Sequence, residues 1–203
     1  MEGGQKTGWF YDHRMNRQRL QAYAPGKRVL DVFSYVGGWG IQAACAGATQ
    51  VTCVDSSSGA IDSVHHNAKI NGLDNIETIE GDAFDALKAL CDEKEKFDIV
   101  VLDPPALIPR RRDQKAGEEA YARLNQLGLR LLDRDGLLVS ASCSMHLSQE
   151  KLTDIIRSSG RKIDRFVQLL EQGHQAPDHP VVPGIPETDY IKSCFVRSLT
   201  GFL

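Results

Sequence analysis

Short apolar runs rich in β-branched residues alternate along the chain with longer stretches of helical periodicity. Alternation of this kind, with short connections, predicts a parallel sheet covered by helices on both faces. The runs that predict the first five strands are Arg28–Phe33, Gln50–Asp55, Ile76–Glu80, Phe97–Asp103 and Gly136–Ser142. The stretches that predict helices are Gly38–Ala46, Ser57–Asn71, Ala83–Glu93, Gly117–Leu132 and Ser148–Ser159.

The last part of the chain has a different pattern. Two further strands are predicted over Ile163–Leu170 and Tyr190–Leu199, with a long proline-rich loop, Glu171–Thr188, in place of a helix between them. Without a crossover helix, we expect the last of the seven strands to run antiparallel. A loop of this length usually serves a function. No repeat or linker interrupts residues 1–203, so we expect a single α/β domain, with residues 1–27 leading into it.

The composition is that of an ordinary globular protein. The chain has 203 residues, of which 41% are hydrophobic and 25% charged, and this is enough to bury a core without disulfides or metals. No apolar run approaches the ~20 residues that span a bilayer, so neither a membrane anchor nor a signal peptide is expected. The five scattered cysteines contain no C-x-x-C pair. This favours a cytoplasmic protein over a disulfide scaffold or a zinc site.

The charge is unevenly distributed. A net charge of −3 argues against binding nucleic acid through the whole surface. Basic residues nevertheless gather in two places, the first 28 residues and the triplet Arg110-Arg111-Arg112. The simplest interpretation of each cluster is a solvated surface, and a local basic patch beside a site is the alternative.

Four of the predicted strand ends carry residues suited to binding a ligand. Gly37-Gly38 follows the first strand, Asp55 ends the second, Gly81-Asp82 follows the third, and Asp103-Pro104-Pro105 follows the fourth. Alone, each has a simpler interpretation as a helix N-cap, a tight turn or a strand exit. Ligands of open α/β sheets bind at the carboxyl ends of the strands, so four successive strand ends of this kind favour a ligand site.

These residue types also indicate which ligand they could hold. Glycines at a strand-to-helix turn let a ligand approach the backbone and the free N–H groups of the helix. The carboxylate of Asp55 can accept both hydroxyls of a ribose, and that of Asp82 can reach an exocyclic amine. The turn after the first strand is not G-x-G-x-x-G. A dinucleotide site is therefore the weaker interpretation.

In these motifs the sequence resembles the class I S-adenosylmethionine-dependent methyltransferases. Val29–Gly40 looks like their first motif, with Phe-Ser-Tyr replacing the usual glycines. The resemblance implies a Rossmann-like fold and S-adenosylmethionine as cofactor, with Asp55 on the ribose and Asp82-Ala83 facing the adenine. The cofactor-binding residues that it implies are Arg14, Phe33, Ser34, Tyr35, Gly37, Gly38, Asp55, Ser56, Asp82, Ala83, Asp103 and Pro104.

A narrower resemblance covers nearly the whole chain. The sequence is similar to the RlmI-like family of bacterial large-subunit ribosomal RNA cytosine-C5 methyltransferases, whose members also carry an N-terminal RNA-binding domain. The segments that carry the resemblance are Lys6–Arg14, the Phe33–Gly38 turn, Ser142-Cys143-Ser144, Asp178-His179-Pro180 and Tyr190-Ile191-Lys192. It implies ribosomal RNA as the partner and methylation of carbon 5 of a cytosine as the reaction.

Methylating carbon 5 of a pyrimidine requires activation of a poor nucleophile. The usual solution is a thiolate that adds at carbon 6. Cys143 follows the fifth strand at the expected edge of the sheet, whereas the other four cysteines lie within predicted helices or strands. We therefore expect Cys143 and Asp103 to be catalytic, with Asp103 assisting at N3. The base that removes the carbon-5 proton is unassigned, and the loop histidine His179 is one candidate.

Three alternatives remain open. A guanine-directed ribosomal RNA methyltransferase would share the Asp12-x-Arg14 motif and would need no cysteine. A non-catalytic module would bind the cofactor without transferring its methyl group. An NAD-dependent oxidoreductase would bind NADH, and the Phe-Ser-Tyr turn argues against it. The sequence does not indicate an oligomeric state.

Overall fold

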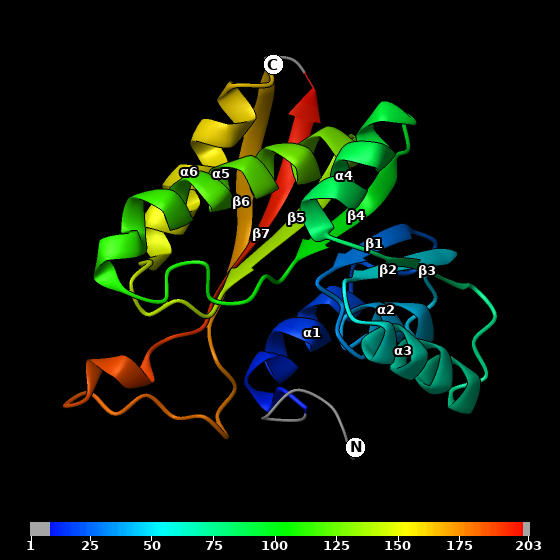
Figure 1. Cartoon of the computed structure of the whole chain (residues 1–203), viewed down its shortest axis with the longest axis horizontal. Coiled ribbons are helices and arrows are strands. Elements are labelled where there is room, and N and C mark those ends of the chain that lie inside the picture. The colour runs from blue at the N-terminus through cyan, green and yellow to red at the C-terminus, as the bar shows by residue number, and fades with distance from the viewer. Residues whose placement is uncertain (1–8, 201–203) are drawn as a thin grey trace.

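The computed structural model describes residues 9–200, which form one open sheet with helices on both faces (Figure 1). The sheet contains β1 (Arg28–Val32), β2 (Gln50–Asp55), β3 (Ile76–Glu80), β4 (Phe97–Leu102), β5 (Leu132–Ser142), β6 (Arg165–Gly173) and β7 (Lys192–Thr200). Their order is β3-β2-β1-β4-β5-β7-β6, and only the two pairings made by β7 are antiparallel. The predicted α/β class, with seven strands and an antiparallel last strand, is confirmed.

The helices form a layer on each side of the sheet (Figure 1). The first layer contains α1 (Arg14–Gln21), α2 (Gly40–Cys45) and α3 (Ser58–Ile70), and the second contains α4 (Ala83–Asp92), α5 (Gln114–Leu131) and α6 (Gln149–Arg161). Three 3-10 turns complete the described secondary structure, at Tyr11–His13, Arg111–Asp113 and Pro186–Thr188. The central strands β1 and β4 are buried almost throughout. Burial on both faces explains why their sequences are continuous apolar runs.

The strand order places a site at one edge of the sheet. From β1 the chain proceeds outward to β2 and β3, and then returns to place β4 on the other side of β1. The order therefore reverses between β1 and β4. Such a reversal opens a crevice at the carboxyl ends of the strands, where open α/β sheets bind ligands.

Three boundaries differ from the predictions. Helix α1 was not predicted, because its buried side consists of Asn16, Arg17 and Leu20 and gives no apolar periodicity. β5 begins at Leu132, which pairs with Phe97 before the ladder breaks and resumes farther along. β6 extends to residue 173 and β7 begins at residue 192, so the proline-rich loop starts and ends about three residues later than predicted.

Within residues 9–200, no helix is long and apolar enough to cross a membrane. No group of three or more His, Cys, Asp or Glu side chains in the same range is arranged to hold a metal ion. All five cysteines are free thiols. Lys6, Thr7 and Gly8, which carry part of the family resemblance, lie outside the described residues.

Candidate functional site at the carboxyl edge of the sheet

The chain leaves β1 through a tight turn. Phe33, Tyr35 and Gly37 have positive φ angles of 63°, 50° and 84°. Residues with a Cβ rarely adopt this conformation, and non-glycine residues that do so cluster at functional sites. The Ser34 N–H anchors the turn by donating to the carbonyl of Val54 in β2 (3.0 Å). The Phe-Ser-Tyr variant of the motif is thus a strained turn held against the neighbouring strand.

Two buried oxygens beside this turn lack protein partners. Within residues 9–200, neither Ser34 Oγ nor Asp31 Oδ1 has a hydrogen-bond partner. Asp31 Oδ2 accepts a hydrogen bond from the Gly40 N–H at 2.8 Å. Burial raises the pKa of Asp31 to about 7, although this N–H favours the charged form. Because buried polar groups are normally hydrogen-bonded, we infer that a polar ligand completes this turn.

Asp55, the last residue of β2, and Asp82, which follows β3, make different hydrogen bonds. Asp55 accepts the N–H of Tyr35 at Oδ2 (2.8 Å) and that of Ser57 at Oδ1 (2.9 Å). It therefore ties two strand-end turns together, and Ser57, not Asp55, caps α3. Asp82 is an N-cap, since its Oδ1 accepts two backbone N–H groups from the first turn of α4. This cap uses Oδ1 alone, so within residues 9–200 Oδ2 is available to a ligand.

The other predicted cofactor residues follow the same strand ends. Gly38 lies in the turn after β1, exposed Ser56 follows Asp55, and buried Ala83 begins α4. Buried Pro104 directly follows Asp103 at the end of β4. Together with the residues described above, they place the predicted cofactor set along β1 to β4, with Arg14 as the exception.

Arg14 contacts the proline-rich loop. Its Nε is 3.4 Å from Asp178 in the proline-rich loop, and its side chain is half exposed. Arg17 is buried, donates to the Phe10 carbonyl at 2.8 Å, and would lie 3.7 Å from a Cβ placed on Gly38. The fold therefore brings Arg17 to the turn. A cofactor contact by Arg14 stays a prediction.

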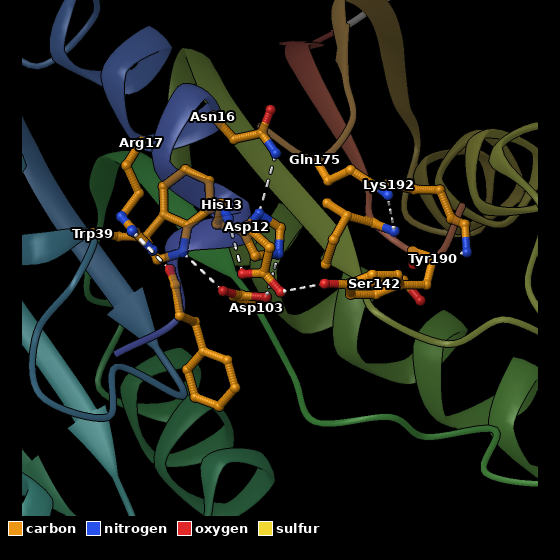
Figure 2. Close-up of polar contacts among 12 residues, drawn as sticks. Asp12, His13, Asn16, Arg17, Trp39, Asp103, Ser142, Gln175, Tyr190 and Lys192 are labelled. Atoms are coloured by element: carbon orange, nitrogen blue, oxygen red, sulfur yellow. Dashed lines mark hydrogen bonds and ion pairs between the residues drawn. The ribbon is translucent and has the colours of Figure 1, made fainter. Parts of the chain in front are cut away.

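Asp103 follows β4 directly and lies between two ring side chains (Figure 2). Its Oδ2 accepts the indole N–H of Trp39 at 2.8 Å, and its Oδ1 lies 3.4 Å from Nε2 of His13. Burial alone would raise the pKa of Asp103, but His13, Trp39 and Arg17 outweigh this effect and lower it. The carboxylate is therefore ionised at neutral pH and oriented by its partners.

Asn16 determines how His13 presents its proton. The Asn16 Nδ2 group donates to the carbonyl of His174 (3.1 Å), while its Oδ1 accepts from Arg19 (3.1 Å). These contacts fix the amide so that the same Nδ2 donates to His13 Nδ1, also at 3.1 Å. Burial lowers the pKa of His13, and Asp103 and Asp12 more than offset this, so the pKa is raised. Above that pKa, the single imidazole proton is on Nε2 and faces Asp103.

The Ser142-Cys143-Ser144 turn is held rigidly at the end of β5. The buried hydroxyl of Tyr121 on α5 lies 2.8 Å from Ser142 Oγ and 3.2 Å from Ser144 Oγ. The N–H of Ser144 donates to Ser142 Oγ (3.1 Å), and the N–H of Ile108 donates to Ser144 Oγ (3.3 Å). Two serines thus anchor the turn on either side of Cys143.

The N-terminal segment meets the start of β7 beside this turn (Figure 2). The hydroxyl of Tyr190 donates to Asp12 Oδ2 at 3.1 Å. The buried ammonium of Lys192 donates to the carbonyls of Ser144 (2.8 Å) and Tyr190 (3.0 Å). A continuous chain of contacts therefore links Asp12 to the cysteine turn.

The thiol of Cys143 has acidic and basic neighbours. Burial, together with the Asp103 and Asp12 carboxylates, raises the pKa of Cys143 to about 11, and Lys192 acts in the opposite direction. The thiol is therefore protonated at neutral pH in the free protein. The other four cysteines lie within α2, β2, α4 and β7, so only Cys143 follows a strand at this edge.

Other residues proposed from the sequence lie in the proline-rich loop and just before α5. His179 pairs with Asp178 at 3.3 Å in the proline-rich loop, and its contact with a reacting base stays a prediction. Arg110, Arg111 and Arg112 are exposed where the chain enters α5. Tyr35 of the turn after β1 contacts Phe10 edge-on, with ring centroids 6.0 Å apart.

The structure adds residues that the sequence analysis did not assign. His13, Asn16 and Trp39 all belong to the network around Asp103. The available signal was weak, because a polar buried side gives α1 no hydrophobic pattern. Proximity of residues 13 and 16 to residue 103 depends on the fold and is not encoded in local spacing.

One edge of the sheet carries a proton acceptor, a thiol nucleophile and turns with polar groups that can bind a ligand. Asp103 and Cys143 end adjacent parallel strands, β4 and β5. The turns after β1, β2 and β3 lie at the same edge, and within residues 9–200 Asp31 Oδ1 and Ser34 Oγ at the end of β1 have no hydrogen-bond partner. Such a site can hold a polar ligand next to a group that is attacked by a thiol.

Similar proteins support this description. The chain matches the family described as Conserved hypothetical protein 95 over residues 17–153. It is similar to "Ribosomal RNA large subunit methyltransferase I" of Klebsiella pneumoniae subsp. pneumoniae, with 38% identity over 199 residues, 97% of this chain and 50% of that protein. The protein of the same name from Aeromonas salmonicida is 38% identical over 200 residues, 98% of this chain and 50% of that protein. The chain thus spans about half the length of these relatives.

Solved structures share the fold. SMU.776, a protein provisionally assigned as a methyltransferase and solved with SAH bound, superposes with a TM-score of 0.83 and 25% identity, over 94% of this chain and 50% of that one. A SAM-dependent methyltransferase from Agrobacterium tumefaciens superposes with a TM-score of 0.68 and 21% identity, over 94% of this chain and 62% of that one. The chain has the class I S-adenosylmethionine-dependent methyltransferase fold and belongs to the Conserved hypothetical protein 95 family.

Proposed function

We propose that this chain transfers a methyl group from S-adenosylmethionine to carbon 5 of a cytosine in large-subunit ribosomal RNA. In this proposal Cys143 forms a covalent bond to carbon 6 of the base. The observation that carries it is that Asp103 and Cys143 directly follow two adjacent parallel strands, β4 and β5, at the same edge of the sheet. The names of the relatives support ribosomal RNA as the substrate.

The residues at the strand ends fit S-adenosylmethionine. The cofactor has a methionine carboxylate and amine, a ribose diol and an adenine. Ser34 Oγ, Asp31 Oδ1 and Arg17 Nε are buried atoms without hydrogen-bond partners in residues 9–200, and they suit the charged methionine end. Asp55 suits the ribose hydroxyls, and Asp82 suits the adenine amine. When bound, the cofactor supplies an electrophilic methyl group.

In the proposed reaction, the Cys143 sulfur bonds to carbon 6 and the electrons of the C5–C6 double bond shift toward C4 and N3. The thiol proton passes through Asp103 to N3. Because Asp103 is ionised and held by His13 and Trp39, it can accept this proton and release it. Carbon 5 becomes enamine-like and takes the methyl group.

The cycle ends when a base takes the carbon-5 proton and the C6–S bond breaks. The double bond returns between C5 and C6, and the thiolate regains its proton from N3 through Asp103. We propose that Asp12 removes the carbon-5 proton, because contacts through Tyr190 and Lys192 link this carboxylate to the turn that carries Cys143. The hydroxyl of Tyr190 would orient this acid.

The proposal is tested with methyl-labelled S-adenosylmethionine and ribosomal RNA, supplied both naked and as large subunits, followed by nucleoside analysis. We expect the label in 5-methylcytosine. Label in a methylguanosine would establish the guanine-directed alternative and contradict ours. Cofactor binding without transfer to either substrate would instead indicate a non-catalytic module, and tight NADH binding without S-adenosylmethionine binding would indicate an oxidoreductase.

A further inference from the structure

A groove of about 870 Å³ lies beside the candidate site and is not part of the strand-end turns described above. One wall is the segment between β5 and α6, and the opposite wall is the proline-rich loop between β6 and β7, at the lower left of Figure 1. The start of α5 closes one side through Arg111 and Gln114. The volume is in the range of sites that bind small organic groups.

The groove adjoins the turn that carries Cys143. Its lining includes Lys192, whose ammonium donates to the Ser144 carbonyl next to Cys143. Met145, two residues after Cys143, also lines it. An RNA strand whose target base lay at Cys143 could therefore place a neighbouring nucleotide in this groove.

The lining combines apolar surfaces with hydrogen-bonding groups. Met145, Val181 and Val182 are exposed large apolar side chains, with exposed fractions of 53%, 44% and 43%. The side-chain amides that share the groove are Gln114, Gln149 and Gln172. A nucleobase has the matching character, since its faces are apolar and its edges carry donors and acceptors. Amides can pair with either kind of edge.

The charges in the groove favour one nucleotide over a continuous phosphate track. Arg111 lines the groove, and Arg110 and Arg112 flank it in sequence. Glu150 and Asp189 also line it and would repel a run of phosphates. The basic groups can thus hold a phosphate at the rim while the base lies between the apolar walls.

We propose that this groove binds the nucleotide that adjoins the target base in single-stranded RNA. The apolar side chains of Met145, Val181 and Val182 contact the face of that base, and Arg111 contacts its phosphate. This inference rests on the proposed function, because it takes RNA as the substrate. It adds that one neighbouring nucleotide is recognised in its unpaired state.

The test measures RNA affinity without requiring catalysis. A fluorescein-labelled single-stranded RNA of about eight nucleotides with one central cytosine is titrated by anisotropy. We expect Val182→Asp to raise the Kd for RNA about tenfold, because it removes an apolar contact and adds a negative charge. Arg111→Gln should raise the Kd about fivefold and reduce the salt dependence by about one phosphate contact.

Two controls accompany these variants. Arg112→Gln removes a neighbouring charge that does not line the groove, and we expect its effect to be less than half that of Arg111→Gln. S-adenosylmethionine affinity should be unchanged in all three variants, which verifies folding. If Val182→Asp and Arg111→Gln leave the Kd unchanged, or if the wild-type chain does not bind this RNA, the groove proposal is wrong.

The outcomes separate this proposal from the proposed function. Weaker RNA binding in the groove variants, without 5-methylcytosine formation by the wild type, would retain the groove and reject the reaction. Formation of 5-methylcytosine with unaltered RNA binding in the variants would retain the reaction and reject the groove.

Discussion

The two halves of the site are built in different ways. The strand-end half consists of the turns after β1, β2 and β3, where short segments lie next to one another because parallel strands end at one edge. The assembled half brings together residues 12–16, Asp103, the Ser142–Ser144 turn and residues 190–192, which are far apart in the sequence. The difference shows that binding groups can follow from strand order alone, whereas the proposed catalytic groups depend on long-range packing.

This difference has a functional consequence. In the strand-end half, Asp31 Oδ1 and Ser34 Oγ are buried and have no hydrogen-bond partner within residues 9–200, so they are free to bind a ligand. In the assembled half, Asp103, His13 and Asn16 already hold one another in the free protein. We therefore expect substitutions in the first half to change cofactor affinity and substitutions in the second half to change the rate of methyl transfer.

The largest effect is expected for Asp103→Asn. The amide keeps a similar shape but cannot accept and release a proton, so the rate of methyl transfer should fall about 10²- to 10⁴-fold. The Kd for S-adenosylmethionine, measured by calorimetry, should change by less than about tenfold. If Asp103→Asn instead weakened cofactor binding strongly and kept the wild-type rate at saturating cofactor, the distinction between the two halves would be wrong.

The reactivity of Cys143 should depend strongly on pH. Because its pKa is raised to about 11, the thiol is protonated at neutral pH, and below that pKa its thiolate fraction increases about tenfold for each unit by which the pH rises. Alkylation by iodoacetamide, followed by mass spectrometry of the Cys143 peptide, should accelerate about 100-fold between pH 7 and 9. Exposed Cys45 provides an internal reference for access of the reagent. A rate that is already constant above pH 8 would show that the thiol is activated in the free protein.

In the strand-end half, Asp55→Asn should weaken S-adenosylmethionine binding by tens of fold. The amide would offer one acceptor oxygen where the carboxylate offers two, and its NH₂ group would face the N–H of either Tyr35 or Ser57. Loss of one charged hydrogen bond costs about 1.5–3 kcal/mol. The rate at saturating cofactor should stay within about threefold of the wild type. A lower rate of methyl transfer with unchanged cofactor affinity would contradict the assignment of Asp55 to cofactor binding.

A smaller effect is expected when the proton on His13 is redistributed. Asn16→Asp replaces the donor that faces Nδ1 by an acceptor, so it should raise the pKa of His13 and favour the doubly protonated ring. A charged ring would make Asp103 a weaker proton acceptor, and methyl transfer should slow about tenfold near neutral pH.

Nitrogen-detected NMR of the histidine ring measures this change directly. The wild-type protein should show the neutral ring with its proton on Nε2 above the pKa, and Asn16→Asp should shift the titration to higher pH. Asn16→Ala, which loses the same amide contacts without adding a charge, should not. A neutral wild-type ring protonated on Nδ1 would contradict the hydrogen bonding described for Asn16.

The same contrast explains how much could be predicted from the sequence. The strand pattern predicted the sheet, its antiparallel last strand and the strand-end residues, because periodicity and turn residues are local signals. Asp82 as an N-cap could be anticipated, whereas the bridge made by Asp55 between two turns requires the strand order. Arg17 and His13 could not be assigned, since they reach Gly38 and Asp103 only after α1 packs beside the sheet.

Trapping the covalent intermediate tests the central proposal most directly. A large-subunit ribosomal RNA with 5-fluorocytosine in place of cytosine cannot lose a proton from carbon 5 after methylation, so the C6–S bond should persist. With S-adenosylmethionine present, we expect a denaturation-resistant complex of protein and RNA, with the nucleotide located on Cys143 by mass spectrometry and no complex from Cys143→Ser. Formation of 5-methylcytosine by Cys143→Ser on unmodified RNA, or a trapped nucleotide on another residue, would contradict the proposed chemistry.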